Sequence, residues 1–189
     1  MNADLLVYQA KAFYNAYIAL DQLSRDDSDT LLLLFAPLVV NGAFSVELAL
    51  KAILAKNQIE YGKEHNLLIL FQMLPKSFQQ ELWAYLIEKA PEYAGSKKGL
   101  DELILLSNAF VDWRYAFEGK PVPAIESRFL AAFANAAVHT MFSYYNADLL
   151  PATKTESNNE IEQRFHENRE KCKEINLKMI QKKTKEHQL

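Results

Sequence analysis

The segment from Leu31 to Leu54 restricts the fold of this chain more than any other part of the sequence. It reads LLLLFAPLVVNGAFSVELALKAIL, and its only charged residues are Glu47 and Lys51. A helix that is apolar on every side is either a membrane span or the central helix of a packed bundle. A span needs about 20 apolar residues, and here a proline, an asparagine and a serine interrupt the run before Glu47. We therefore predict a buried central helix.

The rest of the chain shows helical spacing of apolar residues and no alternating pattern typical of strands. Asn66 is suited to cap a short helix that Pro75 ends, and Ser77 with Gln80 forms a capping box for the next helix. Two glycines, a proline and two lysines make 91–99 a predicted loop. The other helices are predicted at 4–23, 28–58, 101–119 and 124–145. The sequence therefore predicts an all-α fold, a bundle of five or six helices plus a C-terminal helical arm.

The predicted domain organisation is one helical domain followed by an appendage, as expected for 189 residues. The bundle covers 1–150, the linker PATKTESNN covers 151–159, and a charged helical arm covers 160–189. The net charge of −3 argues against a general polyanion binder. A single cysteine, Cys172, and the lack of metal-ligand spacing predict no metal site and no cofactor. Asp4 and Tyr8 interrupt any early signal peptide, so we expect a cytoplasmic protein without membrane contact.

Three motifs follow one another in an informative order. Residues 43–54 read AFSVELALKAIL, which is similar to the pattern A-x-S-x-E-L-A-L-K-A-L-L. Residues 65–71 read HNLLILF, which fits H-D/N-L-x-x-L-F/Y, and Arg114 with Tyr115 forms an Arg-Tyr pair near the end of a later helix. Together, over roughly residues 5–147, these segments resemble the HEPN family of nucleotide-binding and ribonuclease-related helical domains.

The resemblance implies a helical bundle that commonly dimerises and that either cleaves RNA in defence and toxin systems or binds nucleotides or RNA. Catalytic members of the family carry an arginine followed, after four to six residues, by a histidine. Here Gly119, Lys120 and Pro121 stand where the histidine after Arg114 would be, and no other arginine in the bundle has a histidine at that spacing. The sequence therefore resembles a family member without the usual ribonuclease motif.

Glu47 and Lys51 form a polar pair in an otherwise apolar helix. Their i, i+4 spacing allows a direct ion pair, and buried charge demands further partners. Arg114, Tyr115 and His65 are the partners that neighbouring helices could supply. A structural pair is the simpler interpretation, and a substrate-binding cluster of Glu47, Lys51, Arg114 and Tyr115 is the alternative.

Arg114 and Glu118 are a second i, i+4 pair near a helix end. A salt bridge is the simpler interpretation of this pair. The alternative is a phosphate-binding arginine, because the planar guanidinium matches phosphate oxygens.

Two histidines are weak candidates for acid–base work, because an unperturbed imidazole titrates near neutral pH. His65 precedes a predicted helix and is otherwise a capping or core-edge residue. His139 shares a helix face with Asn135 and Arg128, and a buried hydrogen-bond stripe or a dimer contact is its simpler interpretation. A non-standard catalytic set would therefore draw on Arg114, Glu118, His65 and His139.

The C-terminal arm carries a group of lysines that includes Lys178, Lys182, Lys183 and Lys185. Lysines near a helix C-terminus suit the helix dipole in a solvated arm. RNA contact is the alternative, because clustered lysines supply non-specific affinity for phosphates.

The first functional hypothesis is a module that binds RNA, a nucleotide or a protein partner encoded nearby, as in toxin–antitoxin and defence systems, without cutting RNA. A metal-independent ribonuclease with the non-standard set is the second hypothesis. A purely structural partner-binding protein is the third. We also expect a homodimer, because the helices at 31–54 and 124–145 are both apolar all round, which is more than one small bundle can bury.

Overall fold

The computed structural model describes residues 3–24, 28–115 and 123–145. The chain divides into two compact units, Met1–Ala147 and Asp148–Leu189, and the described residues all belong to the first unit. Glu118, the predicted linker and the predicted arm with its lysines lie outside the described residues.

The described part is helical throughout and contains no strand, which confirms the all-α class. Its helices follow one another along the chain. They are α1 (Ala3–Ser24), α2 (Ser28–Lys56), α3 (Leu67–Met73), α4 (Lys76–Lys89), the 3-10 turn η1 (Pro91–Tyr93), α5 (Ser96–Leu106), α6 (Ala109–Arg114) and α7 (Ser127–Tyr145).

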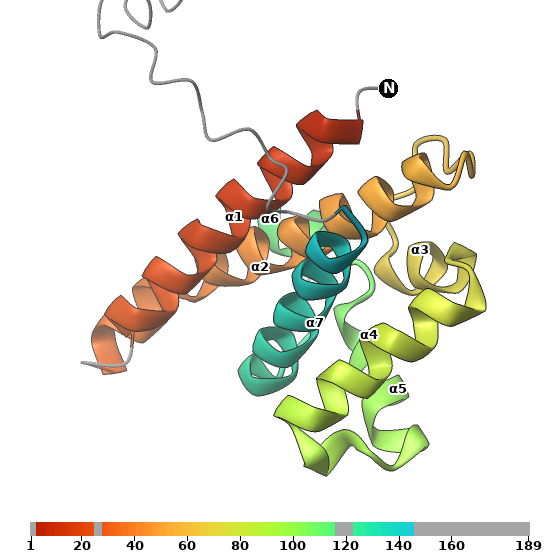
Figure 1. Ribbon diagram of the computed structural model, residues 1–189. Helices are drawn as coiled ribbons and strands as arrows, with labels where there is room; N and C mark the ends of the chain where they lie inside the picture. Colours follow the sequence, from red (N-terminus) through yellow and green to blue (C-terminus); the bar gives the residue numbers. More distant parts are fainter. Residues whose placement is uncertain (1–2, 25–27, 116–122, 146–189) are drawn as a thin grey trace, which may run out of the picture. The chain divides into compact units, whose positions relative to one another are not determined.

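Helix α2 lies at the centre of the bundle, and α1 runs along it (Figure 1). Helices α6 and α7 also pack on α2, and α4 packs on α7. The segment Leu33–Lys56 is long and apolar enough to cross a membrane, but more than half of its most apolar window is buried among the other helices. Its residues at the core of the bundle are buried, so the prediction of a buried central helix is confirmed.

Two side chains fasten the end of α7 to the end of α2. Lys56 Nζ donates to the Tyr144 carbonyl over 2.7 Å, where the negative end of the α7 dipole lies. Tyr145 Oη donates to the Ala52 carbonyl over 2.9 Å. These bonds fix the packing of the two most apolar helices.

The helix that was predicted over 101–119 is wrong, because the structure contains two shorter helices there. Helix α5 begins at Ser96 and ends at Leu106, and α6 begins at Ala109. The Leu67 amide donates to the Ser107 carbonyl over 2.8 Å, and Asn66 Nδ2 donates to Asn108 Oδ1 over 3.0 Å. The start of α3 thus binds the chain at the break between α5 and α6.

The prediction of a loop over 91–99 is also wrong, because η1 and the first turn of α5 occupy these residues. Tyr93 of η1 is fully buried and packs edge-to-face on Phe129 of α7, with ring centroids 5.1 Å apart. A buried aromatic anchor therefore orders a segment whose glycines and proline suggested a loop.

The Asn66 cap is confirmed, whereas the Ser77–Gln80 capping box is wrong. Asn66 Oδ1 accepts from the Ile69 amide over 3.1 Å. Pro75 occupies the N-cap position of α4, and no side chain caps this helix. Gln79 Nε2 instead donates to the Leu74 carbonyl over 2.8 Å, which binds α4 to the end of α3.

Candidate functional site

The buried charges of α2 form the centre of the candidate site. Lys51 Nζ lies 2.7 Å from Glu47 Oε1, and both residues are buried. The i, i+4 spacing places both side chains on one face of the helix. The structure therefore contains the ion pair that their spacing allowed.

His65 is the third member of this group. Its Nδ1 lies 2.9 Å from the same Glu47 Oε1, and half of its side-chain surface is exposed. Glu64 Oε1 holds the loop in place by accepting from the backbone amides of His65 and Asn66. Of the partners suggested by the sequence, His65 is therefore the one that binds Glu47, while Asn66 takes the capping role. We refer to Glu47, Lys51, Tyr61 and His65 as the Glu47 cluster.

Tyr61 closes the cluster on the side of Lys51. Lys51 Nζ lies 5.4 Å from the centre of the Tyr61 ring, within cation–π range. Burial raises the pKa of the Tyr61 phenol, and the negative charge of Glu47 raises it further. Sequence analysis missed Tyr61, and its only signal was its place in the turn between α2 and His65.

Glu47 Oε2 is buried and has no hydrogen-bond partner among the described residues. A carboxylate oxygen that lacks a partner away from water costs free energy. The Glu47 cluster therefore contains one acceptor that packing and stability do not explain.

Arg114 lies against Phe110, an aromatic residue that also neighbours His65 of the Glu47 cluster. Its guanidinium carbon is 4.7 Å from the Phe110 ring centre and 4.6 Å from the Tyr115 ring centre. Its Nη2 also donates to Tyr115 Oη over 3.0 Å. Phe110 also neighbours His65, with ring centroids 6.4 Å apart. Within the described residues no hydrogen bond joins Arg114 to Glu47.

Phe110 is itself fixed by stacking on α2. Its ring lies 4.3 Å from that of Phe44, and the two planes are inclined by only 13°. Arg114 and Tyr115 are exposed at the end of α6. The aromatic stack therefore presents a guanidinium to solvent from a rigid base.

The arrangement orients the imidazole of His65 for proton transfer. An ionised carboxylate can only accept, so a neutral His65 donates from Nδ1 to Glu47 and keeps Nε2 as an acceptor. An exposed guanidinium nearby favours anions such as phosphate. The exposed Arg114 guanidinium can therefore attract a phosphate group, and the His65 imidazole can accept a proton.

His139 lies elsewhere, on the contact between α4 and α7. Its ring stacks on that of Tyr85 at 3.9 Å, and the residue is exposed, so the prediction of a buried hydrogen-bond stripe is wrong for this histidine. No contact in the described part of the chain joins it to His65 or Arg114. Arg128 is bound by a salt bridge to Glu92 Oε1, with its Nε 2.6 Å away.

Among the described residues, no group of three His, Cys, Asp or Glu side chains could hold a metal ion.

Comparison with the curated proteins and comparison with the solved structures each gave no significant match. The family model described as HEPN domain matches residues 38–121. That match contains the Glu47 cluster, Phe110, Arg114 and Tyr115. Residues 38–121 of this chain are therefore similar to the HEPN domain family.

Proposed function

We propose that this chain binds RNA through a phosphate group at the surface formed by Arg114 and His65, as a HEPN module without the usual ribonuclease motif. The observation that carries the proposal is the exposed guanidinium of Arg114, held over Phe110 and Tyr115. A guanidinium that is already oriented loses less side-chain entropy when it binds phosphate. The exposed Tyr115 ring beside it offers a face on which a base can stack.

The direct test is fluorescence anisotropy with a labelled single-stranded RNA in low salt. Arg114→Ala should weaken binding about tenfold, because one charge-assisted bond to phosphate is lost. The matched control is Arg128→Ala, which removes an exposed arginine that pairs with Glu92 on another surface. Equal affinities for the wild type and Arg114→Ala would contradict the proposal.

A metal-independent ribonuclease is the second candidate, and the 2.9 Å contact between His65 Nδ1 and Glu47 favours it. His65 Nε2 would take the proton of the ribose 2′-hydroxyl. That oxygen would attack the adjacent phosphorus, and the 5′-oxygen would leave and take a proton from water. Arg114 would stabilise the negative charge on the phosphorane.

Cleavage of labelled RNA in the presence of a chelator separates the two candidates. For the binding module we expect no cleavage above the background without protein. A ribonuclease would lose about 10²–10⁴-fold in rate in His65→Asn, while its RNA affinity stays within a few fold. The variant His139→Asn is the matched control, because its ring packs on Tyr85 and not on the Glu47 cluster.

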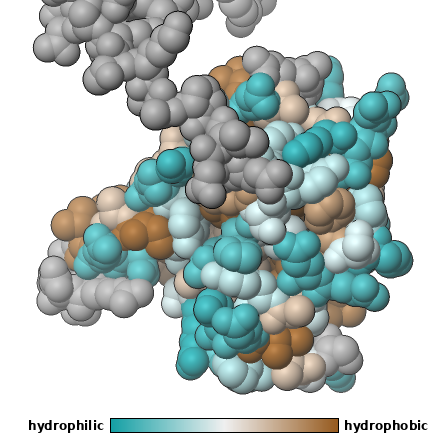
Figure 2. Space-filling model, viewed as in Figure 1, coloured by the Kyte–Doolittle hydropathy of each residue, from teal (hydrophilic) through white to brown (hydrophobic). Residues whose placement is uncertain are grey.

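We further infer a cytoplasmic homodimer that works in a defence or toxin–antitoxin type system with a protein partner encoded nearby. Support for the dimer comes from the region where α1 ends and α2 begins, which exposes Leu23 and Leu33 by 58% and 80%. Figure 2 shows hydrophobic surface on this part of the molecule. Sedimentation should give twice 21.7 kDa, and Leu33→Glu should favour the monomer. A wild-type monomer at tens of micromolar would contradict the dimer.

The contribution of Lys178, Lys182, Lys183 and Lys185 to RNA binding stays a prediction. Truncation after Pro151 should then reduce RNA affinity and the slope of affinity against salt. An unchanged slope would assign the binding to the bundle alone.

A further inference from the structure

A groove of about 500 Å³ lies on the side of the bundle where α3, α4 and α5 meet. It shares no residue with the Glu47 cluster, Arg114 or Tyr115. Its volume falls within the range of small-molecule sites. It is lined by Phe71, Lys76, Gln79, Gln80, Trp83, Ala84, Ile87, Leu100 and Leu103.

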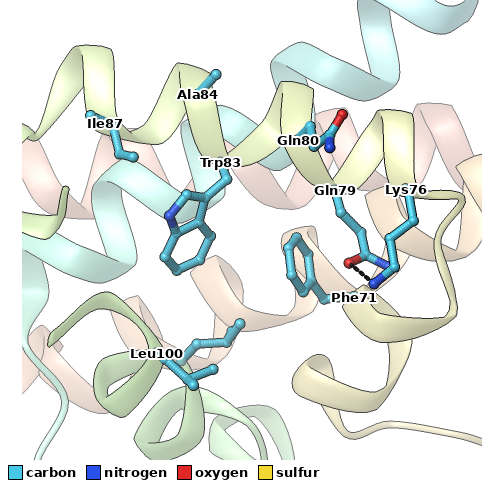
Figure 3. A pocket seen from close by; sticks show the side chains of 9 residues that line it. Phe71, Lys76, Gln79, Gln80, Trp83, Ala84, Ile87 and Leu100 are labelled. Carbon is cyan, nitrogen blue, oxygen red and sulfur yellow. Dashed lines mark hydrogen bonds between the residues drawn. The ribbon is translucent and has the colours of Figure 1, made fainter. Parts of the chain in front are cut away.

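The middle of the groove is aromatic and aliphatic. Trp83 of α4 and Phe71 of α3 point into it, and Leu100 of α5 faces them from the other side (Figure 3). The rings of Phe71 and Trp83 lie 6.0 Å apart and form a continuous apolar floor. Leu100 is 44% exposed, so this wall lies open to solvent.

Gly99 keeps the floor in place. A Cβ atom at this position would lie 2.7 Å from Trp83 Cζ2, which is closer than van der Waals contact allows. The backbone of α5 therefore supports the indole directly. A larger residue would push Trp83 into the groove.

One end of the groove carries a positive charge in a defined position. Lys76 Nζ donates to Gln79 Oε1 over 3.1 Å, and Figure 3 shows this bond at the end opposite Ile87. Gln79 cannot swing away easily, because its Nε2 donates to the carbonyls of Gln72 and Leu74. Within the described residues no carboxylate pairs with Lys76. Its ammonium group therefore keeps donors for an anion.

We propose that this groove binds a small amphiphile with an unbranched apolar chain and a terminal carboxylate. The chain lies on Phe71 and Trp83 between α4 and α5, and the carboxylate accepts a hydrogen bond from Lys76 Nζ. The apolar floor matches the chain of the ligand, and the single cation at one end matches its terminal carboxylate. A nucleic acid fits the groove poorly, because one lysine meets many phosphates and most of the lining is apolar.

The test titrates hexanoate, octanoate, decanoate and decanol, below their micelle concentrations, into the full chain. The reporter is Trp83 fluorescence in Trp113→Phe, which leaves Trp83 as the only indole, and calorimetry on the wild type gives an independent reading. Affinity should rise about two- to threefold for each added CH₂, because each one buries more apolar surface. Lys76→Gln should weaken decanoate about three- to tenfold and leave decanol unchanged.

Lys63→Gln is the matched control, since Lys63 is an exposed lysine that does not line the groove. It should leave the affinity for decanoate unchanged. Three results would overturn the proposal. The first is the absence of any saturable signal with the carboxylates. The second is equal affinity for decanoate and decanol together with no effect of Lys76→Gln. The third is binding of an acidic amphipathic peptide but of none of the carboxylates. RNA affinity should be the same in Lys76→Gln as in the wild type, so this test stands apart from that of the RNA surface.

Discussion

Two neighbouring stretches of helix α2, around Gly42 and around Glu47, are buried in the bundle but stabilised in different ways. At Gly42, an added Cβ would lie 3.0 Å from Tyr17 of α1 and 3.1 Å from Leu130 of α7, so three helices meet at close range. At Glu47, the same helix buries a carboxylate that binds a buried lysine and a half-exposed histidine. Close packing explains the glycine. It does not explain the charges, because an apolar set of similar volume often gives equal stability. Function must therefore explain the stretch of α2 that carries Glu47 and Lys51.

The largest effect is expected from Glu47→Ala. This change leaves Lys51 buried without its partner, so we expect a loss of about 3–5 kcal/mol in the free energy of unfolding. Denaturation in urea at neutral pH measures it. A loss below about 1 kcal/mol would mean that Lys51 reaches water in the variant and that the comparison with Gly42 fails.

The double variant Glu47→Leu with Lys51→Met is the control that separates stability from function. It removes both charges and keeps the volume, so the free energy of unfolding should return to within about 1 kcal/mol of the wild type. If RNA affinity falls in this stable variant, the charges are kept for the site. Unchanged RNA affinity would mean that the two charges have a structural role and do not contribute to RNA binding.

The second effect comes from the apolar stretch, through Gly42→Val. The added methyl groups must enter space where even a Cβ is crowded by Tyr17 and Leu130, so we expect a loss of about 1–3 kcal/mol. Gly95→Ser is the matched control, because nothing lies within 4 Å of a Cβ there and serine is a good N-cap for α5. An equal effect of both changes would show that packing at Gly42 is looser than the distances indicate.

The two stretches of α2 also differ in how far the sequence predicted them. The apolar run was enough to predict a buried central helix, because helical periodicity is a local property. The i, i+4 pair of Glu47 and Lys51 was predictable for the same reason. The contact of His65 with Glu47 depends on the path of the turn after α2, so the sequence could name His65 only as one of several partners.

The errors outside α2 have the same origin. The break between α5 and α6 is held by the Leu67 amide and by Asn66, which lie far away along the chain. Capping by Ser77 fitted a local pattern, but Pro75 took the cap position and Gln79 bound the end of α3. Patterns within one helix were thus predictable, and contacts between helices were not.

The smallest effect concerns Tyr145, which joins α7 to α2 at Ala52, next to Lys51. Burial raises the pKa of the Tyr145 phenol to about 12, and the nearby Asp4, Tyr144 and Tyr61 add to the rise. An unfolded tyrosine titrates near pH 10. Between about pH 10 and 12 the folded chain therefore holds a proton that the unfolded chain has lost, so stability falls as the pH rises.

In Tyr145→Phe we expect a loss of about 0.5–1.5 kcal/mol at neutral pH, from the missing hydrogen bond to Ala52. The difference in free energy of unfolding between wild type and variant should shrink as the pH rises from about 10 to 12, because only the wild type has this phenol to ionise. Other tyrosines and the lysines titrate in both chains, so the difference between the two urea curves isolates Tyr145. A gap that stays constant from pH 7 to 12 would mean that Tyr145 ionises alike in both states. The RNA affinity of the two chains gives a second reading. If the difference in free energy of unfolding shrinks while the RNA affinities stay equal, the bond between α7 and α2 can weaken without disturbing the Glu47 cluster.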